Sequence, residues 1–170
     1  LKNINNGFYW DKWKGLSCNK NITLKLLEII TNKPWKWGKC GLSYNENIKI
    51  EWIHKFPYKQ WDWGIFGISS NKSITLNWIR TFPNKPWFWG KNGLSSNPNI
   101  TIKWIEEFPN KPWDWGKNGL SSNPNITIEW LRKFKDKEWD WSNYGLSRNT
   151  NIRLSWIEEF PNKPWVWGIH

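Results

Sequence analysis

The chain has 170 residues, a formal net charge of +11 at pH 7 and a mean hydropathy of −0.77, yet it contains 19 Trp, 8 Phe and 4 Tyr. No apolar run approaches the roughly 18 residues that a membrane span needs, so no membrane contact is expected. The large rings argue against a disordered chain, because each can bury on the order of 150–250 Å².

A 26-residue repeat runs through the chain and is marked by Trp-x-Trp pairs. Residues 1–34 form a degenerate first repeat, expected to cap the array, in which Tyr9 and Asp11 stand at the positions of the Trp pair. Residues 35–164 hold five tandem repeats, and residues 165–170 begin a further one. We interpret this as one continuous repeat domain and as a segment of a longer chain. The pairs are Trp35/Trp37, Trp61/Trp63, Trp87/Trp89, Trp113/Trp115, Trp139/Trp141 and Trp165/Trp167.

The second part of each repeat predicts a helix. In the clearest repeat, Asn97 is a candidate N-cap and Pro98 a candidate first helical residue. Ile100, Trp104 and Phe108 then follow at helical spacing, over a predicted length of about 11 residues that ends before Pro109. One Trp per repeat lies on this apolar stripe and is expected in the core: Trp52, Trp78, Trp104, Trp130 and Trp156.

The first part of each repeat, such as Trp113 to Asn123, predicts a second short helix or an ordered turn. Gly119, equivalent to Gly93, is expected to adopt a positive φ. Ser and Asn recur once per repeat, as at Asn97 and Asn123. They are expected to hydrogen-bond the backbone of their own turn or of the neighbouring repeat.

These patterns favour an all-α solenoid of about six 26-residue helix-turn repeats. A β-containing solenoid is the alternative, because Ile100, Ile102 and Trp104 alternate as in a strand and Leu94-Ser95-Ser96-Asn97 resembles the turn of leucine-rich repeats. Against it, Asn92 and Asn118 stand where that family needs a leucine.

The two Trp of each pair are two residues apart, so they point to different sides of a helix or strand. We expect one to pack between repeats and the other to face a second layer or a groove. Two outcomes remain open: both rings lie in the core, or a row of rings lies on the surface.

The string LSSNPNIT, followed by a helix and then FPNKPWDW, occurs at Leu94–Trp115 and more weakly at Leu120–Trp141. It resembles the tryptophan-rich repeats of proteins from giant nucleocytoplasmic large DNA viruses, and the resemblance covers nearly the whole chain. It implies a viral source, a repeat fold and a location in the virion or the reducing host cytoplasm, and it carries over no catalytic or binding residue. The chain departs from the pattern by extra glycine, as at Gly116 and Gly119.

Catalytic machinery is sparse in this sequence. His54 and His170 do not occupy a repeated position, and with Cys18 and Cys40 they match no structural zinc spacing. The two cysteines are expected to be reduced thiols, although a disulfide between them stays open. We therefore expect no catalytic residue, metal or cofactor.

One lysine per repeat, within Pro-Asn-Lys-Pro or a variant, is the candidate partner-binding feature. A row of lysines interleaved with aromatic rings suits nucleic acid, whereas a soluble, exposed loop residue explains the lysines equally well. The scarcity of arginine weakens the nucleic-acid interpretation. We call these residues the lysine row: Lys33, Lys59, Lys85, Lys111, Lys137 and Lys163.

The sequence thus favours a non-enzymatic scaffold that binds protein, as a virion structural component or an adaptor toward host proteins. A nucleic-acid-binding solenoid that uses the lysine row is the second hypothesis, and an enzyme is the third.

Overall fold

The computed structural model describes residues 15–168 and divides into two compact units. The N-terminal unit ends at Phe88 and the C-terminal unit begins at Trp89. The expected degenerate positions Tyr9 and Asp11, and also His170, lie outside the described residues.

Each described repeat contributes one 3-10 helix of three residues and one α-helix of six. No strand occurs between residues 15 and 168, so the all-α repeat fold is confirmed and the β-containing alternative is excluded. The N-terminal unit holds η1 (Leu16–Cys18), α1 (Leu24–Ile29), η2 (Leu42–Tyr44), α2 (Ile50–Lys55), η3 (Ile68–Ser70) and α3 (Leu76–Thr81). The C-terminal unit holds η4 (Leu94–Ser96), α4 (Ile102–Glu107), η5 (Leu120–Ser122), α5 (Ile128–Lys133), η6 (Leu146–Arg148) and α6 (Leu154–Glu159).

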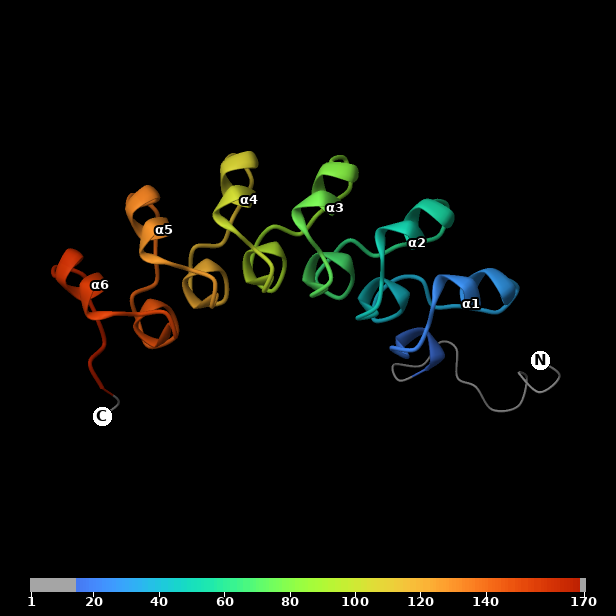
Figure 1. Ribbon diagram of the computed structural model, residues 1–170, viewed down its shortest axis with the longest axis horizontal. Helices are drawn as coiled ribbons and strands as arrows, with labels where there is room; N and C mark the ends of the chain where they lie inside the picture. The colour runs from blue at the N-terminus through green and yellow to red at the C-terminus, as the bar shows by residue number, and fades with distance from the viewer. Residues whose placement is uncertain (1–14, 169–170) are drawn as a thin grey trace. The chain divides into compact units, whose positions relative to one another are not determined.

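Consecutive repeats stack within each unit. The α-helices line one side of the stack and the 3-10 helices line the other (Figure 1). The 3-10 helices touch in sequence order, η1 with η2 and η2 with η3 in one unit, and η4 with η5 and η5 with η6 in the other. Helices this short depend on packing, since an isolated helix below about 12 residues is marginal in water.

The α-helix is shorter than the sequence predicts. In the repeat of α4 it begins at Ile102, after Thr101, so neither Asn97 nor Asn99 is its N-cap. Asn97 instead ends η4 with extended backbone angles, and its side-chain oxygen accepts a hydrogen bond from the amide of Asn99 at 2.8 Å. This turn takes up the residues that were expected to form the first helical turn.

The end and the apolar stripe of the helix agree with the prediction. α4 ends at Glu107, and Phe108 adopts a non-helical conformation before Pro109. Ile100 and Trp104 are at most 2 % exposed. The helix Trp of each repeat is buried, as expected of a core residue: Trp52, Trp78, Trp104, Trp130 and Trp156.

The recurring glycine serves a close approach rather than a positive φ. Gly93 and Gly119 have φ values of −117° and −124°, which corrects the prediction. A Cβ on Gly119 would lie 2.1 Å from the carbonyl oxygen of Asp114, which accepts a hydrogen bond from the amide of Leu120 at 2.8 Å. Among the described non-glycine residues, Cys40 and Asn92 have positive φ.

None of the helices between residues 15 and 168 combines the length and apolar character needed to cross a bilayer.

Candidate interaction surfaces

A buried serine braces each repeat against the next. Ser95 Oγ donates to the carbonyl of Trp89 at 2.6 Å and accepts from the amide of Asp114 in the following repeat at 2.9 Å. Ser43 does the same with Trp37 and Asp62 in the N-terminal unit. Because this hydroxyl satisfies backbone groups of two repeats at once, its recurrence has a structural cause.

A ladder of asparagines makes a second link between repeats. Asn123 Nδ2 donates to the carbonyl of Asn97 at 2.9 Å, and Asn149 Nδ2 donates to the carbonyl of Asn123 at 3.0 Å. Asn45 and Asn71 are linked in the same way at 2.9 Å. These side chains are at most 6 % exposed, so they belong to the framework and are not open to a ligand.

The two Trp of a pair have different environments. The first is buried and donates its indole N–H to a backbone carbonyl five residues earlier, as Trp113 does to Phe108 at 2.9 Å. The second packs edge-on against the first Trp of the following repeat. The ring centres of Trp89 and Trp113 are 5.0 Å apart, with an interplanar angle of 85°. Both rings therefore take part in packing, although Trp37, Trp115 and Trp141 remain half-buried.

The lysine row lies over these second Trp rings. Lys111 Nζ is 5.3 Å from the ring centre of Trp89, and Lys85 Nζ is 5.6 Å from that of Trp63. At such distances the cation is attracted by the ring quadrupole. Each of these lysines thus contacts the second Trp of its own repeat, 22 residues earlier in the sequence. The same contact joins Lys59 to Trp37, Lys137 to Trp115 and Lys163 to Trp141, and Lys33 of the row is half-buried.

One segment of the row shares a cavity with carboxylates. This cavity of about 440 Å³ in the C-terminal unit is lined by Trp115, Lys137, Asp114, Asp136 and Glu138, among others. Three acidic residues and one lysine line it, so a phosphate group would meet net negative charge there.

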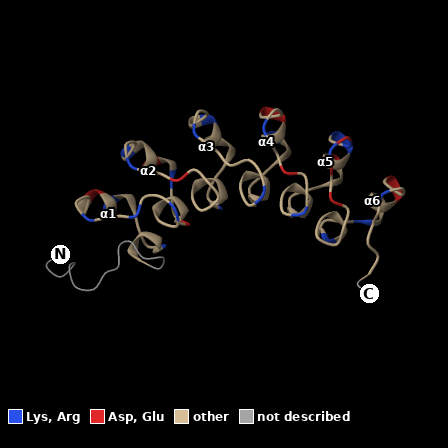
Figure 2. Cartoon of the chain, turned by 180° about the vertical axis from the view of Figure 1, so that it is seen from behind, with Lys and Arg blue, Asp and Glu red and all other residues tan. Residues whose placement is uncertain are grey.

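The α-helices contain residues of both signs of charge (Figure 2). Arg132 on α5 makes a bidentate pair with Glu159 on α6, with N–O distances of 2.7 and 2.6 Å. This hydrogen bond lowers the pKa of Glu159. Lys55 pairs with Glu28 at 2.8 Å in the N-terminal unit. Within the bounds of the six α-helices, six basic and seven acidic residues nearly cancel.

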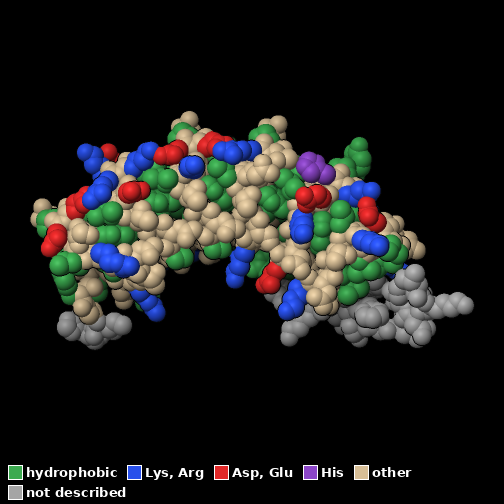
Figure 3. Space-filling view, viewed as in Figure 1, with side chains coloured by type: hydrophobic (Ala, Val, Ile, Leu, Met, Phe, Trp, Pro, Cys, Tyr) green, Lys and Arg blue, Asp and Glu red, His purple; other side chains and the backbone are tan. Residues whose placement is uncertain are grey.

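The excess positive charge lies in the remaining segments, and part of it gathers around the 3-10 helices. We define the 3-10 edge as the last residue of each 3-10 helix, the residue two positions later, and the two residues before the recurring glycine. Lys and Arg side chains are visible on this side of the units (Figure 3). Between residues 15 and 168 the charged members are Lys20, Lys39, Glu46 and Lys72 in the N-terminal unit, and Lys91, Lys117 and Arg148 in the C-terminal unit.

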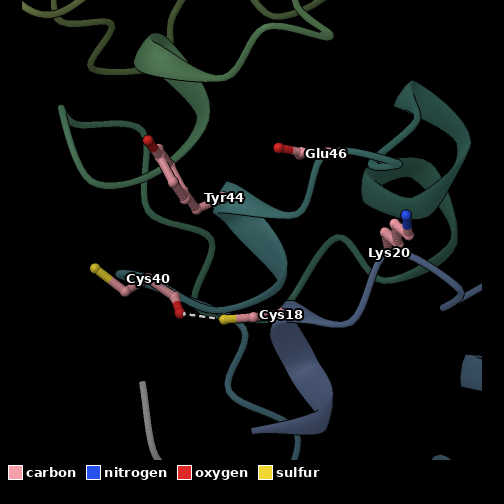
Figure 4. A pocket seen from close by; sticks show the side chains of 5 residues that line it. All are labelled: Cys18, Lys20, Cys40, Tyr44 and Glu46. Carbon is pink, nitrogen blue, oxygen red and sulfur yellow. Dashed lines mark hydrogen bonds between the residues drawn. The ribbon is translucent and has the colours of Figure 1, made fainter. Parts of the chain in front are cut away.

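A groove of about 360 Å³ opens on the 3-10 edge of the N-terminal unit (Figure 4). It is lined by Cys18, Lys20, Cys40, Tyr44 and Glu46. Cys18 Sγ donates to the carbonyl of Cys40 at 2.8 Å, and the Cys40 side chain points away from it. Both thiols are free, and burial raises the pKa of Cys18. The reduced state expected of them is therefore the state in the structure.

The same groove recurs in the C-terminal unit, with a volume of about 290 Å³. Tyr144, Arg148 and Thr150 line it at the positions that Cys40, Tyr44 and Glu46 hold in the first groove. Tyr144 is 65 % exposed, and Lys117 Nζ lies 5.6 Å from its ring centre.

Compared with protein-family models, with curated proteins and with solved structures, the chain gives no match.

The sequence shows lysines before the recurring glycine, at Lys39, Lys91 and Lys117, but nothing in it joins them to the residues that end the 3-10 helices. Several edge positions vary among the repeats, unlike the recurring Ser, Asn and Gly, and that variation was the available signal. The residue that ends each 3-10 helix is Cys18, Tyr44, Ser70, Ser96, Ser122 or Arg148.

The described residues contain no group of three or more His, Cys, Asp or Glu that could hold a metal ion. His54 lies against the ring of Phe82, with ring centres 5.2 Å apart, and belongs to neither groove.

Proposed function

We propose that the chain is a non-enzymatic repeat scaffold that binds another protein through exposed positions that differ between its repeats. Within a stack, each repeat offers the same backbone frame at a regular interval, and repeat arrays create extended binding surfaces in this way. The observation that carries the proposal is that the recurring Ser, Asn and Gly pack the repeats together, whereas positions that vary among the repeats are exposed.

Invariant positions have a structural task. In most repeats the recurring Ser, Asn and Gly are buried and hold one repeat against the next, as Ser95, Asn123 and Gly119 do. Variable positions are concentrated at the surface, where Tyr44 is 50 % and Tyr144 is 65 % exposed. Exposed aromatic side chains are enriched where proteins contact one another.

The lysine row gives less support to nucleic-acid binding than its regularity suggests. Lys85 and Lys111 already lie over Trp rings, and Lys137 lies among carboxylates. The faces of those rings are therefore covered rather than open to stacking bases.

The resemblance to giant-virus repeat proteins extends the proposal to the place where the chain acts. A scaffold of this kind would act as a virion structural component or as an adaptor toward host proteins, in the virion or the host cytoplasm. Because the resemblance carries over no binding residue, the identity of the partner rests on experiment.

A random-peptide display selection against the folded chain tests the proposal. We expect the selection to enrich a family of related peptides, and the synthetic peptides to bind the chain in solution. The control is oligothymidylate, titrated into the same chain over a salt series, because phosphate contacts make binding strongly salt-dependent.

The proposal fails if no peptide family is enriched while the chain binds oligothymidylate tightly at low salt. A steep loss of that binding with salt, and its loss on changing Lys85, Lys111 and Lys137 to Gln, would establish the nucleic-acid alternative.

A further inference from the structure

We infer that the 3-10 edge of the C-terminal unit binds an acidic, extended segment of the partner protein. The inference rests on the proposed function and deepens it, since it names the surface and the chemistry of the ligand.

The charge of this edge is of one sign. Lys91, Lys117 and Arg148 are exposed on it, and none of the edge positions in the C-terminal unit is acidic. The lysine row of the same unit differs, because Asp136 and Glu138 lie beside Lys137. A carboxylate ligand is therefore attracted to the 3-10 edge more than to the row.

The groove on this edge offers groups that suit a peptide. Arg148 brings a planar guanidinium, which matches a carboxylate with two parallel hydrogen bonds. Tyr144 brings an exposed ring for an apolar side chain, and Asn143 and Thr150 bring polar groups at the rim. Its volume of about 290 Å³ accommodates a few side chains rather than a large ligand.

The register of the repeats favours an extended ligand. Edge positions recur once per repeat in the stack, and packed helices are separated by roughly 10 Å. That interval corresponds to about three residues of extended chain at about 3.3 Å per residue. Successive side chains of one segment can thus reach equivalent positions in successive repeats.

A nucleic acid fits this edge less well. The Lys117 ammonium lies 5.6 Å from the ring centre of Tyr144 and occupies one face of the ring, so a base could not be sandwiched there, whereas an apolar side chain needs only the other face or the edge. Arg148 is the one arginine among the edge residues of the described chain. A carboxylate can bind Lys117 and Arg148 without displacing the lysine from the ring.

The corresponding groove of the N-terminal unit serves as an internal contrast. There Glu46 lines the groove together with Lys20 and takes the position of Thr150. The carboxylate of Glu46 repels an acidic ligand, so the C-terminal groove is the tighter site.

The test uses the full chain and two double variants that remove equal charge from the same unit. Lys117→Gln/Arg148→Gln alters the 3-10 edge, and Lys111→Gln/Lys137→Gln alters the lysine row. The probe is a fluorescein-labelled peptide of alternating Glu and Leu, followed by fluorescence anisotropy at about 150 mM salt, where the screening length is about 8 Å. Oligothymidylate of similar charge is the second probe, and circular dichroism verifies that each variant is folded.

We expect the edge variant to weaken peptide binding by about tenfold or more, and the row variant by less than about twofold. Tyr144→Ala alone should also weaken peptide binding relative to the parent, and the variant should stay folded because the position is exposed. An equal loss in both double variants would overturn the inference, because it would indicate a general effect of charge. Tighter binding of oligothymidylate, lost in the edge variant, would overturn it in favour of nucleic acid.

These outcomes are distinguishable from failure of the proposed function. If display selection enriches peptides that are not acidic, or that bind the edge variant unchanged, the scaffold function stands and the inference about the 3-10 edge falls.

Discussion

Lys111 Nζ lies 5.3 Å from the centre of the Trp89 ring, at the other end of the same repeat in the C-terminal unit. The same ring packs edge-on against Trp113, so this Trp is contacted by a cation of its own repeat and by a ring of the following repeat. The regular occurrence of the lysine is thereby explained by packing around the second Trp of each pair. Its spacing in the sequence does not by itself indicate a binding site.

Removing such a lysine is expected to lower stability. Lys111→Gln should reduce the free energy of unfolding by about 0.5–1 kcal/mol, the range of exposed cation–π contacts. Lys103→Gln removes the same charge from the exposed surface of α4 and serves as the matched control. Urea unfolding followed by circular dichroism measures both. Equal effects of the two changes would show that the ring contact contributes nothing.

The helix Trp is expected to dominate the core. Trp104 is 2 % exposed, and Trp104→Ala should cost about 3–5 kcal/mol because it leaves a large cavity. Trp167 is 78 % exposed, so Trp167→Ala should change stability by less than about 0.5 kcal/mol. Thermal and urea unfolding of both variants provide the comparison. A Trp104→Ala protein as stable as the parent would contradict the core assignment.

The buried serine that bonds to the backbone of two repeats predicts contrasting effects for two adjacent serines of η5. Ser121 is fully buried and accepts from the amide of Asp140 at 2.8 Å. Ser121→Ala should therefore cost about 1–3 kcal/mol, because it leaves buried backbone groups without a partner. Ser122 is exposed, and Ser122→Ala should cost within about 0.5 kcal/mol. If the two variants unfold at the same urea concentration, the hydrogen bonds of Ser121 do not stabilise the stack.

The recurring glycine predicts a steric effect. A Cβ at Gly119 would lie 2.1 Å from the Asp114 carbonyl oxygen, whereas nothing lies within 4 Å of a Cβ at Gly168. Gly119→Ala should cost about 1–3 kcal/mol or more through forced backbone movement. Gly168→Ala should leave the unfolding midpoint unchanged. A Gly119→Ala protein of parental stability would mean that the close approach is not required.

The pair between α5 and α6 predicts a pH effect. The hydrogen bond from Arg132 lowers the pKa of Glu159 below its ordinary value. A lowered pKa in the folded state contributes stability above the pKa of the unfolded chain, and that stability is lost as the pH falls through the folded value. The effect is small, because both side chains are exposed.

Carboxyl chemical shifts in an NMR titration report the pKa of Glu159 directly. We expect it to rise toward the ordinary value in Arg132→Gln. Lys103→Gln, which removes the same charge from α4, should leave the titration of Glu159 as it is in the parent. An unchanged Glu159 titration would rule out the pair in solution.

The sequence predicts the repeat period, the apolar stripe of the helix and the burial of Trp104, because apolar spacing and an uninterrupted repeat determine them directly. The residue at which the helix begins could not be predicted in this way. Asn97 has the chemistry of an N-cap, but its side-chain oxygen accepts from the amide of Asn99 in an Asx turn, and its backbone carbonyl accepts from the side chain of Asn123 in the following repeat. The second bond depends on a neighbour that local sequence does not reveal.

The predicted positive φ of Gly119 was wrong for a related reason. A recurring glycine signals either a positive φ or a close approach, and only the position of Asp114 distinguishes the two. The lysine row is visible in the sequence because it never varies, yet the Trp ring that each lysine covers lies 22 residues earlier in the chain. The grooves beside Tyr44 and Tyr144 went unnoticed, since each is assembled from two repeats.

Amide hydrogen exchange of the full chain, with and without a peptide enriched by display selection, tests the central claim most directly. The account predicts that the bound peptide slows exchange around the C-terminal groove, in residues 117–124 and 143–150. Slowing confined to the loops of the lysine row, or slowing produced by oligothymidylate and by no peptide, would contradict it.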